Sequence, residues 1–240
     1  MCITLGLRTE LSRTSPTQEI LRLFARRGLD DPCWVATSSQ VAVAEAFAMQ
    51  VTEAQDVLWV FGAPGVGKTQ TLMRAATESG ALYFDCAEIE QHNRAQLLDA
   101  LDPDQVVIFD RIEHWLGNRE SESDLFSWWK RHRAGHCLIA QISPRMDGLF
   151  VLPDLASRAH ASLVLSIDPL TDAELERLLA CHIDQRGLDL APEVYRFLSP
   201  RIPRNPAKVM ALIDAMDQES LRDQRRITVP WLKRLLVSLS

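Results

Sequence analysis

Apolar residues in the first two thirds of the chain fall into short continuous runs, and stretches with helical spacing separate these runs. Short apolar runs are typical of strands that are buried on both faces of a parallel sheet. The expected strands are Val57–Phe61, Ala81–Phe84, Val106–Phe109, Cys137–Ile142 and Leu163–Ile167. Because strands alternate with helices, we predict an α/β fold whose parallel sheet is covered by helices on both faces.

Apolar residues three or four positions apart indicate the helices. Those expected between the strands are Thr17–Arg27, Ser39–Val51, Thr69–Ser79, Leu97–Leu101 and Leu125–His132. After Pro169 only helical patterns remain. The helices expected there are Asp172–Arg186, Pro192–Leu198, Pro206–Met216 and Val229–Val237. We therefore predict an N-terminal tail over residues 1–18, an α/β domain over 19–168 and a small all-helical domain over 169–240.

Composition excludes several classes of protein. The chain has 240 residues, of which 47% are hydrophobic and 24% charged, as in ordinary globular domains. No apolar run is long enough to cross a membrane, and no signal peptide is evident, so we expect a cytoplasmic protein without a membrane partner. The net charge of -6 argues against sequence-independent binding of nucleic acid and favours a protein partner.

The cysteines and histidines predict no metal site. Five cysteines are widely spaced and contain no C-x-x-C pair, which favours buried thiols over a disulfide framework or a zinc site. His132 and His136 are four residues apart, but Gly135 interrupts the helix between them. We therefore expect both histidine side chains to be solvated.

Trp128 and Trp129 precede a basic run. The pattern fits a helix with one tryptophan inside and a basic outer face, and it also fits a surface for nucleic acid or a protein partner.

The chain contains a P-loop motif, G-x-x-x-x-G-K-[ST], between an expected strand and an expected helix. Its glycines let backbone N–H groups converge on phosphate oxygens, and the following helix presents its positive end to the same anion. Lys68 is expected to neutralise the terminal phosphates, and Thr69 to offer its hydroxyl to Mg²⁺. The nucleotide-binding residues expected here are Gly62, Pro64, Gly65, Val66, Gly67, Lys68, Thr69 and Gln70.

Asp110 follows an apolar run and is the expected second acid of this site, where it would help to bind Mg²⁺. Alone, an aspartate at a strand end is equally typical of a turn. Many related hydrolases carry another acid at the next position to polarise the attacking water, but this chain has Arg111, and we expect Glu113 to point elsewhere. The pattern predicts tight binding of ADP or ATP with Mg²⁺ and slow intrinsic hydrolysis.

Five features together resemble a known family. They are the P-loop, the strand that ends at Asp110, the segment Leu152–Arg158, the helical C-terminal part and the ending Ile227–Lys233. In these segments, and roughly from Trp34 to the end, the chain is similar to the DnaA regulatory inactivators (Hda), which are relatives of the replication initiator DnaA in the AAA+ class. The resemblance implies a P-loop AAA+ domain followed by a helical lid domain.

The resemblance also implies roles for single residues. Arg158 corresponds to an arginine finger, which would act on the triphosphate of a neighbouring DnaA subunit. From its sequence context alone, it would instead be an arginine that pairs with a nearby carboxylate. Trp34, Val35 and the segment Ser38–Gln40 resemble the part of the family that encloses adenine.

Two partners follow from the resemblance, namely DnaA and the sliding clamp. The clamp-binding peptide of the family would place Ile3, Leu5 and Leu7 in a groove, although Cys2 and Gly6 replace its glutamine and proline. The same segment also fits a first β-strand. Because no helix-turn-helix domain follows the lid, we expect no sequence-specific DNA binding. A homo-oligomer is compatible with the sequence.

The sensor positions of the family are altered. Gln141 or Ser143 would stand in for the polar group near the γ-phosphate, and Ala207 aligns with the sensor arginine. Arg204 and Lys208 flank Ala207, and neither aligns with it. Loss of the sensor contact would weaken discrimination between diphosphate and triphosphate, which suits a protein that acts in its ADP state.

These features favour an adenine-nucleotide-binding regulator of replication initiation that stimulates ATP hydrolysis by DnaA. Two alternatives remain open from the sequence. One is an autonomous P-loop ATPase of the helicase-loader or transposition-helper type. The other is an adaptor that binds ADP without catalysis.

Overall fold

The computed structural model describes residues 33–53, 57–132, 137–140, 148–223 and 226–238. Several predicted features lie outside these residues. They are the helix Thr17–Arg27, the tail residues Ile3, Leu5 and Leu7, the sensor candidates Gln141 and Ser143, and His136.

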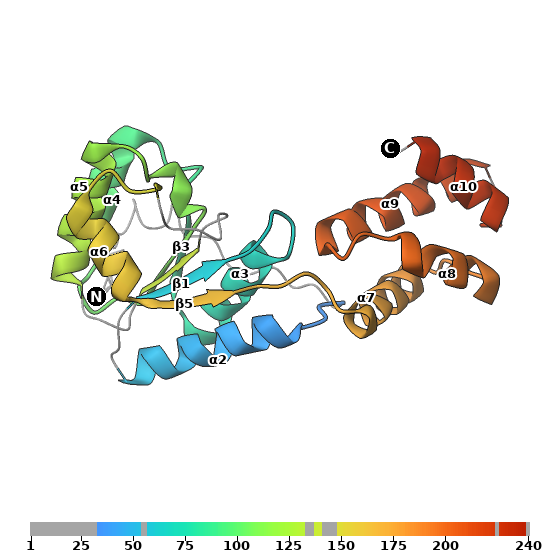
Figure 1. Cartoon of the computed structure of the whole chain (residues 1–240), viewed down its shortest axis with the longest axis horizontal. Coiled ribbons are helices and arrows are strands. Elements are labelled where there is room, and N and C mark those ends of the chain that lie inside the picture. Colours follow the sequence, from blue (N-terminus) through green and yellow to red (C-terminus); the bar gives the residue numbers. More distant parts are fainter. Residues whose placement is uncertain (1–32, 54–56, 133–136, 141–147, 224–225, 239–240) are drawn as a thin grey trace, which may run out of the picture.

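The described strands form a five-stranded parallel sheet in the order β2-β3-β4-β1-β5 (Figure 1). Each lies within an expected apolar run or extends it by one residue. The strands are β1 (Leu58–Phe61), β2 (Leu82–Asp85), β3 (Val107–Asp110), β4 (Cys137–Ala140) and β5 (Leu163–Ser166). β1 is buried along its whole length, as expected for an inner strand, whereas β5 at the edge is largely exposed.

Helices cover both faces of the sheet, and further helices form a separate part. The α/β part contains α2 (Ser38–Glu53), α3 (Lys68–Ser79), α4 (Gln91–Ala100), α5 (Arg119–Arg131) and α6 (Pro153–Ala161). Buried residues of α2 and α3 pack on one face, and those of α4, α5 and α6 pack on the other. The fold class predicted from the sequence is therefore confirmed. Both α4 and α5 begin earlier than predicted, and α6 was not predicted.

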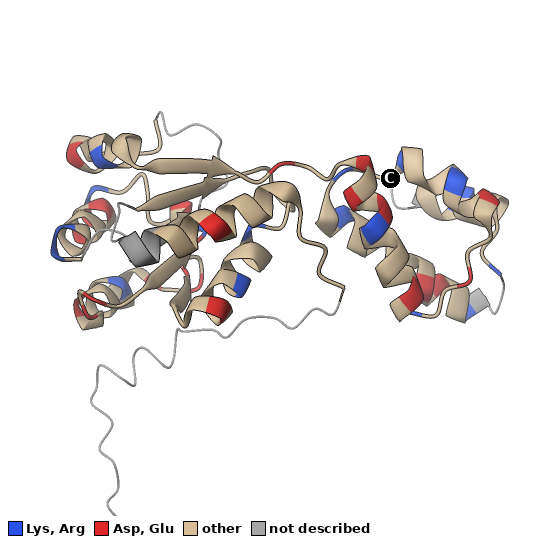
Figure 2. Cartoon of the chain, turned by 90° about the horizontal axis from the view of Figure 1, so that it is seen from below, with Lys and Arg blue, Asp and Glu red and all other residues tan. Residues whose placement is uncertain are grey.

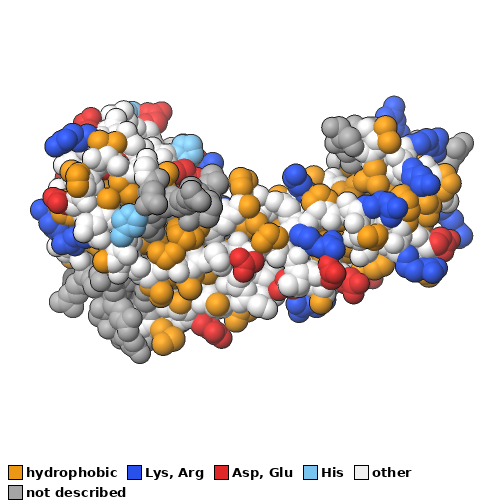
Figure 3. Space-filling model, in the orientation of Figure 1, with side chains coloured by type: hydrophobic (Ala, Val, Ile, Leu, Met, Phe, Trp, Pro, Cys, Tyr) orange, Lys and Arg blue, Asp and Glu red, His pale blue; other side chains and the backbone are white. Residues whose placement is uncertain are grey.

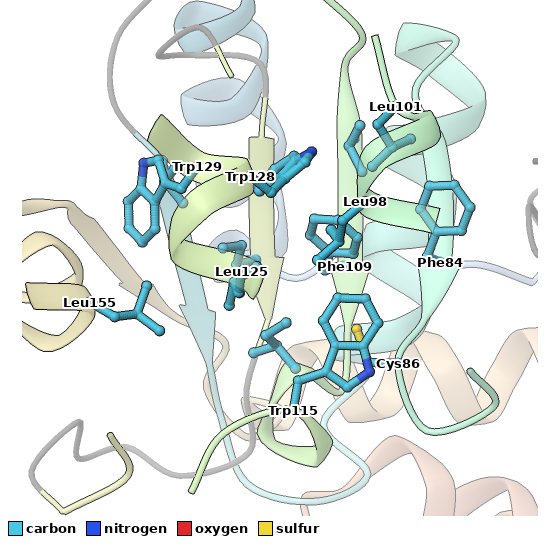
Figure 4. Packing of buried hydrophobic residues seen from close by; sticks show 14 of the residues in the cluster. Phe84, Cys86, Leu98, Leu101, Phe109, Trp115, Leu125, Trp128, Trp129 and Leu155 are labelled. Carbon is cyan, nitrogen blue, oxygen red and sulfur yellow. The ribbon is translucent and has the colours of Figure 1, made fainter. Parts of the chain in front are cut away.

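The face of the sheet that α4, α5 and α6 cover carries a cluster of large aromatic side chains (Figure 4). Phe109 contacts Trp115 and Trp128, with ring centroids 5.3 and 5.0 Å apart. Trp129 is also buried, at 5% exposure. The prediction of a single inward tryptophan was wrong, because α5 packs against α4 and α6 as well as the sheet and so buries a wider face. His132 is buried too, rather than solvated, and its Nε2 lies 2.6 Å from the carbonyl oxygen of Gln105.

The helical part follows β5 and has its own hydrophobic cluster. It contains α7 (Asp172–Gln185), α8 (Pro192–Leu198), the 3₁₀ helix η2 (Ser199–Arg201), α9 (Pro206–Asp223) and α10 (Val229–Ser238). α9 is longer than predicted. The apolar faces of these helices point inward in the pattern expected of a small helical domain.

Two links join the helical part to the segment around the start of α2. The first is Glu174 on α7, whose carboxylate accepts a hydrogen bond from the backbone N–H of Ser38 at 2.9 Å. The same carboxylate also accepts one within the helical part, from the backbone N–H of Thr171 at 2.8 Å. Cys33 forms a disulfide with Cys181 on α7. The expectation of thiols was wrong for this pair, because 148 residues separate the two cysteines in the sequence and only the fold brings their Cα atoms to 5.6 Å. Cys86 is buried, as expected.

Charged side chains of both signs are interspersed over the helices (Figure 2). No extended basic face stands out in this view, in keeping with the negative net charge. Within the described ranges, no helix is both long and apolar enough to span a membrane.

Candidate functional site

The loop after β1 turns at glycines with left-handed backbone. Gly65 has φ +80° and Gly67 has φ +99°, a conformation that residues with a Cβ rarely adopt. A Cβ on Gly65 would lie 2.6 Å from Asn205 Oδ1, and one on Gly67 would lie 2.7 Å from Gln40 Nε2. α3 begins at Lys68, so its first N–H groups are directed toward the loop. Conformation and space therefore both favour glycine in this loop.

Lys68 reaches back over the loop. Its Nζ donates hydrogen bonds to the carbonyl oxygens of Gly62, at 2.7 Å, and Ala63, at 3.0 Å. Burial lowers the pKa of Lys68, while the nearby carboxyl groups of Glu113 and Asp110 act in the opposite direction. Phosphate oxygens bind an ammonium group more strongly than neutral carbonyls do, so Lys68 is well placed for a phosphate.

Asp110 ends β3 and is 1% exposed. Its Oδ2 accepts hydrogen bonds from Thr69 Oγ1, at 2.6 Å, and from the Tyr83 hydroxyl, at 2.7 Å. Its Oδ1 accepts one from the backbone N–H of Arg111. Burial raises the pKa of Tyr83, and the charge and hydrogen bond of Asp110 raise it further. The phenol therefore stays protonated and fixes the orientation of the carboxylate.

The hydroxyl of Thr69 and the carboxylate of Asp110 fit a magnesium site. Both are hard oxygen donors, which Mg²⁺ prefers, and both residues line one cavity with Lys68. No cluster of three or more His, Cys, Asp or Glu suited to a metal occurs in the part of the chain that the structure describes. This donor set therefore suits an ion that arrives with phosphate oxygens as further ligands. Bound there, it would neutralise phosphate charge.

The P-loop and Asp110 line a cavity of about 380 Å³ that α9 closes from the other side. The α9 residues at its wall are Pro206, Ala207 and Met210. The space-filling view shows the molecule hollowed between its α/β and helical parts (Figure 3). These parts thus form opposite walls of one site.

A smaller pocket adjoins this cavity and shares Gln70, Pro206 and Met210 with it. Trp34 and Val35, expected near adenine, line the smaller pocket together with Gln40. The expected site residues Gly62 and Val66 belong to the same loop but line neither pocket. Gly62 accepts the bond from Lys68, and the side chain of Val66 is in the hydrophobic core. The two pockets are adjacent and share part of their walls.

The start of α9 contacts the P-loop directly. Asn205 Nδ2 donates a hydrogen bond to the carbonyl oxygen of Pro64 at 2.6 Å, and the N–H of Ala207 donates one to Gly65 O at 3.2 Å. Arg204, which flanks the missing sensor arginine, instead pairs with Asp172 at 2.5 Å. Neither Arg204 nor Lys208 lines the cavity.

The turn after β3 brings Glu113 into the wall of the cavity, which the sequence did not predict. The turn begins at Arg111. Arg111 has φ +55° and, within the described ranges, no other residue besides glycine has a positive φ. Its guanidinium forms a two-point pair with Asp85 at the end of β2. The 3₁₀ helix η1 (Ile112–His114) starts at once, and Glu113 lines the cavity. The prediction that Glu113 points elsewhere was wrong, because the sequence does not reveal this left-handed turn.

Arg158 lies on α6, at the opposite end of the α/β part from α9 (Figure 1). It is exposed and does not line the cavity. Its guanidinium carbon lies 5.4 Å from the centre of the Phe126 ring, and it forms no ion pair with any residue in the described part. The guanidinium is therefore available to another molecule.

Glu122 holds the start of α6. Its carboxylate, which is completely buried, accepts hydrogen bonds from the backbone N–H groups of Gly117, Val151 and Leu152 at 2.8, 2.9 and 2.6 Å. Leu152 is the N-cap residue of α6. Sequence reasoning missed Glu122, because a glutamate on a predicted helix gives no sign of distant backbone partners.

Domain III of the replication initiation protein DnaA from Thermotoga maritima superposes with a TM-score of 0.68 at 16% identity, over 86% of this chain and 95% of that one. A T. maritima RuvB mutant superposes with a TM-score of 0.68 at 17% identity, over 90% of this chain and 73% of the RuvB chain. An uncharacterized protein of Haemophilus influenzae is 29% identical over 190 residues, which are 76% of this chain and 82% of that protein. The family model for the Hda lid domain matches residues 172–236. Over residues 172–236 the chain thus matches the Hda lid domain, and its fold is that of DnaA domain III and RuvB.

The segment that matches the Hda lid domain begins with α7 and extends into α10. It therefore contains the part of α9 that closes the cavity. The resemblance inferred from the motifs is thus confirmed, as is the succession of a P-loop α/β part and a helical lid.

Proposed function

We propose that this protein binds ADP or ATP with Mg²⁺ in the cavity between the P-loop and the lid. Lys68 and the loop N–H groups bind the phosphates, Thr69 and Asp110 hold the ion, and the pocket of Trp34 and Val35 receives the base. The closed loop geometry and the paired oxygens of Thr69 and Asp110 support this assignment.

With its nucleotide bound, the protein is proposed to regulate replication initiation by stimulating ATP hydrolysis by DnaA. The observation that carries this function is the position of Arg158, which is exposed, unpaired among the described residues and remote from its own cavity. A guanidinium placed on the charge that develops during phosphoryl transfer lowers the barrier strongly. In this role Arg158 acts in trans, on the triphosphate of the partner.

The sliding clamp is the second proposed partner. Ile3, Leu5 and Leu7 are spaced as an extended peptide requires to insert alternate side chains into a groove. Binding to the clamp would concentrate the protein at DNA where DnaA acts.

The direct test is the rate of ATP hydrolysis by purified DnaA with and without this protein, in the presence of clamp and DNA. We expect faster release of phosphate when the protein is added. An unchanged rate, with the protein folded and nucleotide-bound, would overturn the proposed regulation and leave an adaptor as the better interpretation.

A further inference from the structure

Glu113 is an acidic residue of the cavity to which the proposed function gives no role. Both of its carboxyl oxygens are buried, and neither has a hydrogen-bond partner among the described residues. Buried polar atoms in native proteins are almost always paired, because an unpaired one costs free energy. Glu113 lines the same cavity as Lys68 and Asp110, and its charge acts on Lys68. This arrangement indicates a partner that arrives with the ligand.

The backbone around Glu113 is firmly anchored. Ile112 and Trp115 are 0% and 2% exposed and belong to the aromatic cluster on the sheet. The pair between Arg111 and Asp85 secures the other end of the turn. Glu113 therefore stands between fixed neighbours, and its position in the cavity does not depend on a mobile loop.

We propose that Glu113 orients and deprotonates the water that attacks the γ-phosphate of ATP in this cavity, so that the protein hydrolyses its own nucleotide. The inference rests on the proposed nucleotide binding. The acid that related hydrolases carry directly after Asp110 is replaced here by Arg111, and the left-handed turn brings a carboxyl group back two positions later.

The reaction balances with water as the only co-reactant. The water oxygen forms a bond to the γ-phosphorus, and the bond between that phosphorus and the β–γ bridging oxygen breaks. The bridging oxygen leaves with the electron pair as part of ADP, and Glu113 accepts the proton of the water. This activity would convert bound ATP into ADP and so supply the ADP state in which a regulator with Ala207 at the sensor position is expected to act.

Glu113→Gln tests the inference, because the amide keeps the size of the side chain and cannot accept the proton. We expect its single-turnover hydrolysis of MgATP to fall by about 10²-fold or more, while affinity for MgADP is retained. A second readout needs no nucleotide. Since the substitution removes an unpaired buried carboxyl group, the Tm of the ligand-free protein is expected to rise by about 2–4 °C. The matched control is Glu120→Gln on the exposed start of α5, which should change neither quantity.

The possible results separate this inference from the proposed function. Normal MgADP binding with unchanged hydrolysis in Glu113→Gln, or with no hydrolysis by the unmodified protein, would overturn the role of Glu113 alone. A lower Tm in the variant would assign Glu113 a structural role and would also overturn the inference. Failure of the unmodified protein to bind either nucleotide would overturn the proposed function itself.

Discussion

Replacing Arg158 by alanine is expected to reduce the stimulation of ATP hydrolysis by DnaA about 10³-fold. The guanidinium is a fixed fork of N–H donors that matches phosphate oxygens, and alanine supplies neither its charge nor its donors. Because Arg158 lies outside the cavity of its own chain, the variant should bind MgADP as tightly as the unmodified protein. The measurements are phosphate release by DnaA and equilibrium binding of MgADP.

A neighbouring cation provides the control for this substitution. Lys130 Nζ lies 5.0 Å from the centre of the same Phe126 ring, but it belongs to α5. Lys130→Ala removes a positive charge from the same surface and should leave stimulation nearly unchanged. Full stimulation by Arg158→Ala would show that the arginine is only a surface residue packed on an aromatic ring.

Replacing Glu122 by alanine is expected to lower the free energy of unfolding by about 3 kcal/mol. Hydrogen bonds to a carboxylate are stronger than those between neutral groups, and this variant loses the acceptor for the N–H groups of Gly117, Val151 and Leu152. Because these contacts fix the start of α6, stimulation of DnaA should fall as well. Urea unfolding measures the first effect and phosphate release the second.

The same helix offers a comparison for the loss of Glu122. Glu120 is exposed and lies two residues before Glu122 on α5. Glu120→Ala should change the free energy of unfolding by less than about 0.5 kcal/mol. Equal stability of the Glu120 and Glu122 variants would mean that water replaces the carboxylate without cost and that α6 is held by packing alone.

The sequence predicted the sheet and the phosphate loop because their signals are local. The run Leu58–Phe61 is apolar throughout, and such a run directly before a glycine-rich loop is typical of a strand buried on both faces. The glycines and Lys68 form a motif whose spacing is fixed by the anion that it encloses. In both cases residues that are neighbours in the sequence determine the local structure.

Features that depend on distant contacts could not be predicted in this way. Trp129 is buried because α4 and α6 flank α5, and Cys33 meets Cys181 only when the lid folds beside α2. The orientation of Glu113 depends on one backbone torsion at Arg111, which a residue of this type rarely adopts. None of these features leaves a periodic signal in the sequence.

Calorimetric titration of the purified protein with MgADP decides whether the cavity is a nucleotide site. We predict saturable binding of one ADP per chain, and loss of detectable binding in Lys68→Ala when the variant is folded. Absence of binding to the unmodified protein, or equal binding by the Lys68 variant, would contradict the assignment of the P-loop cavity and, with it, the nucleotide-dependent regulation proposed here.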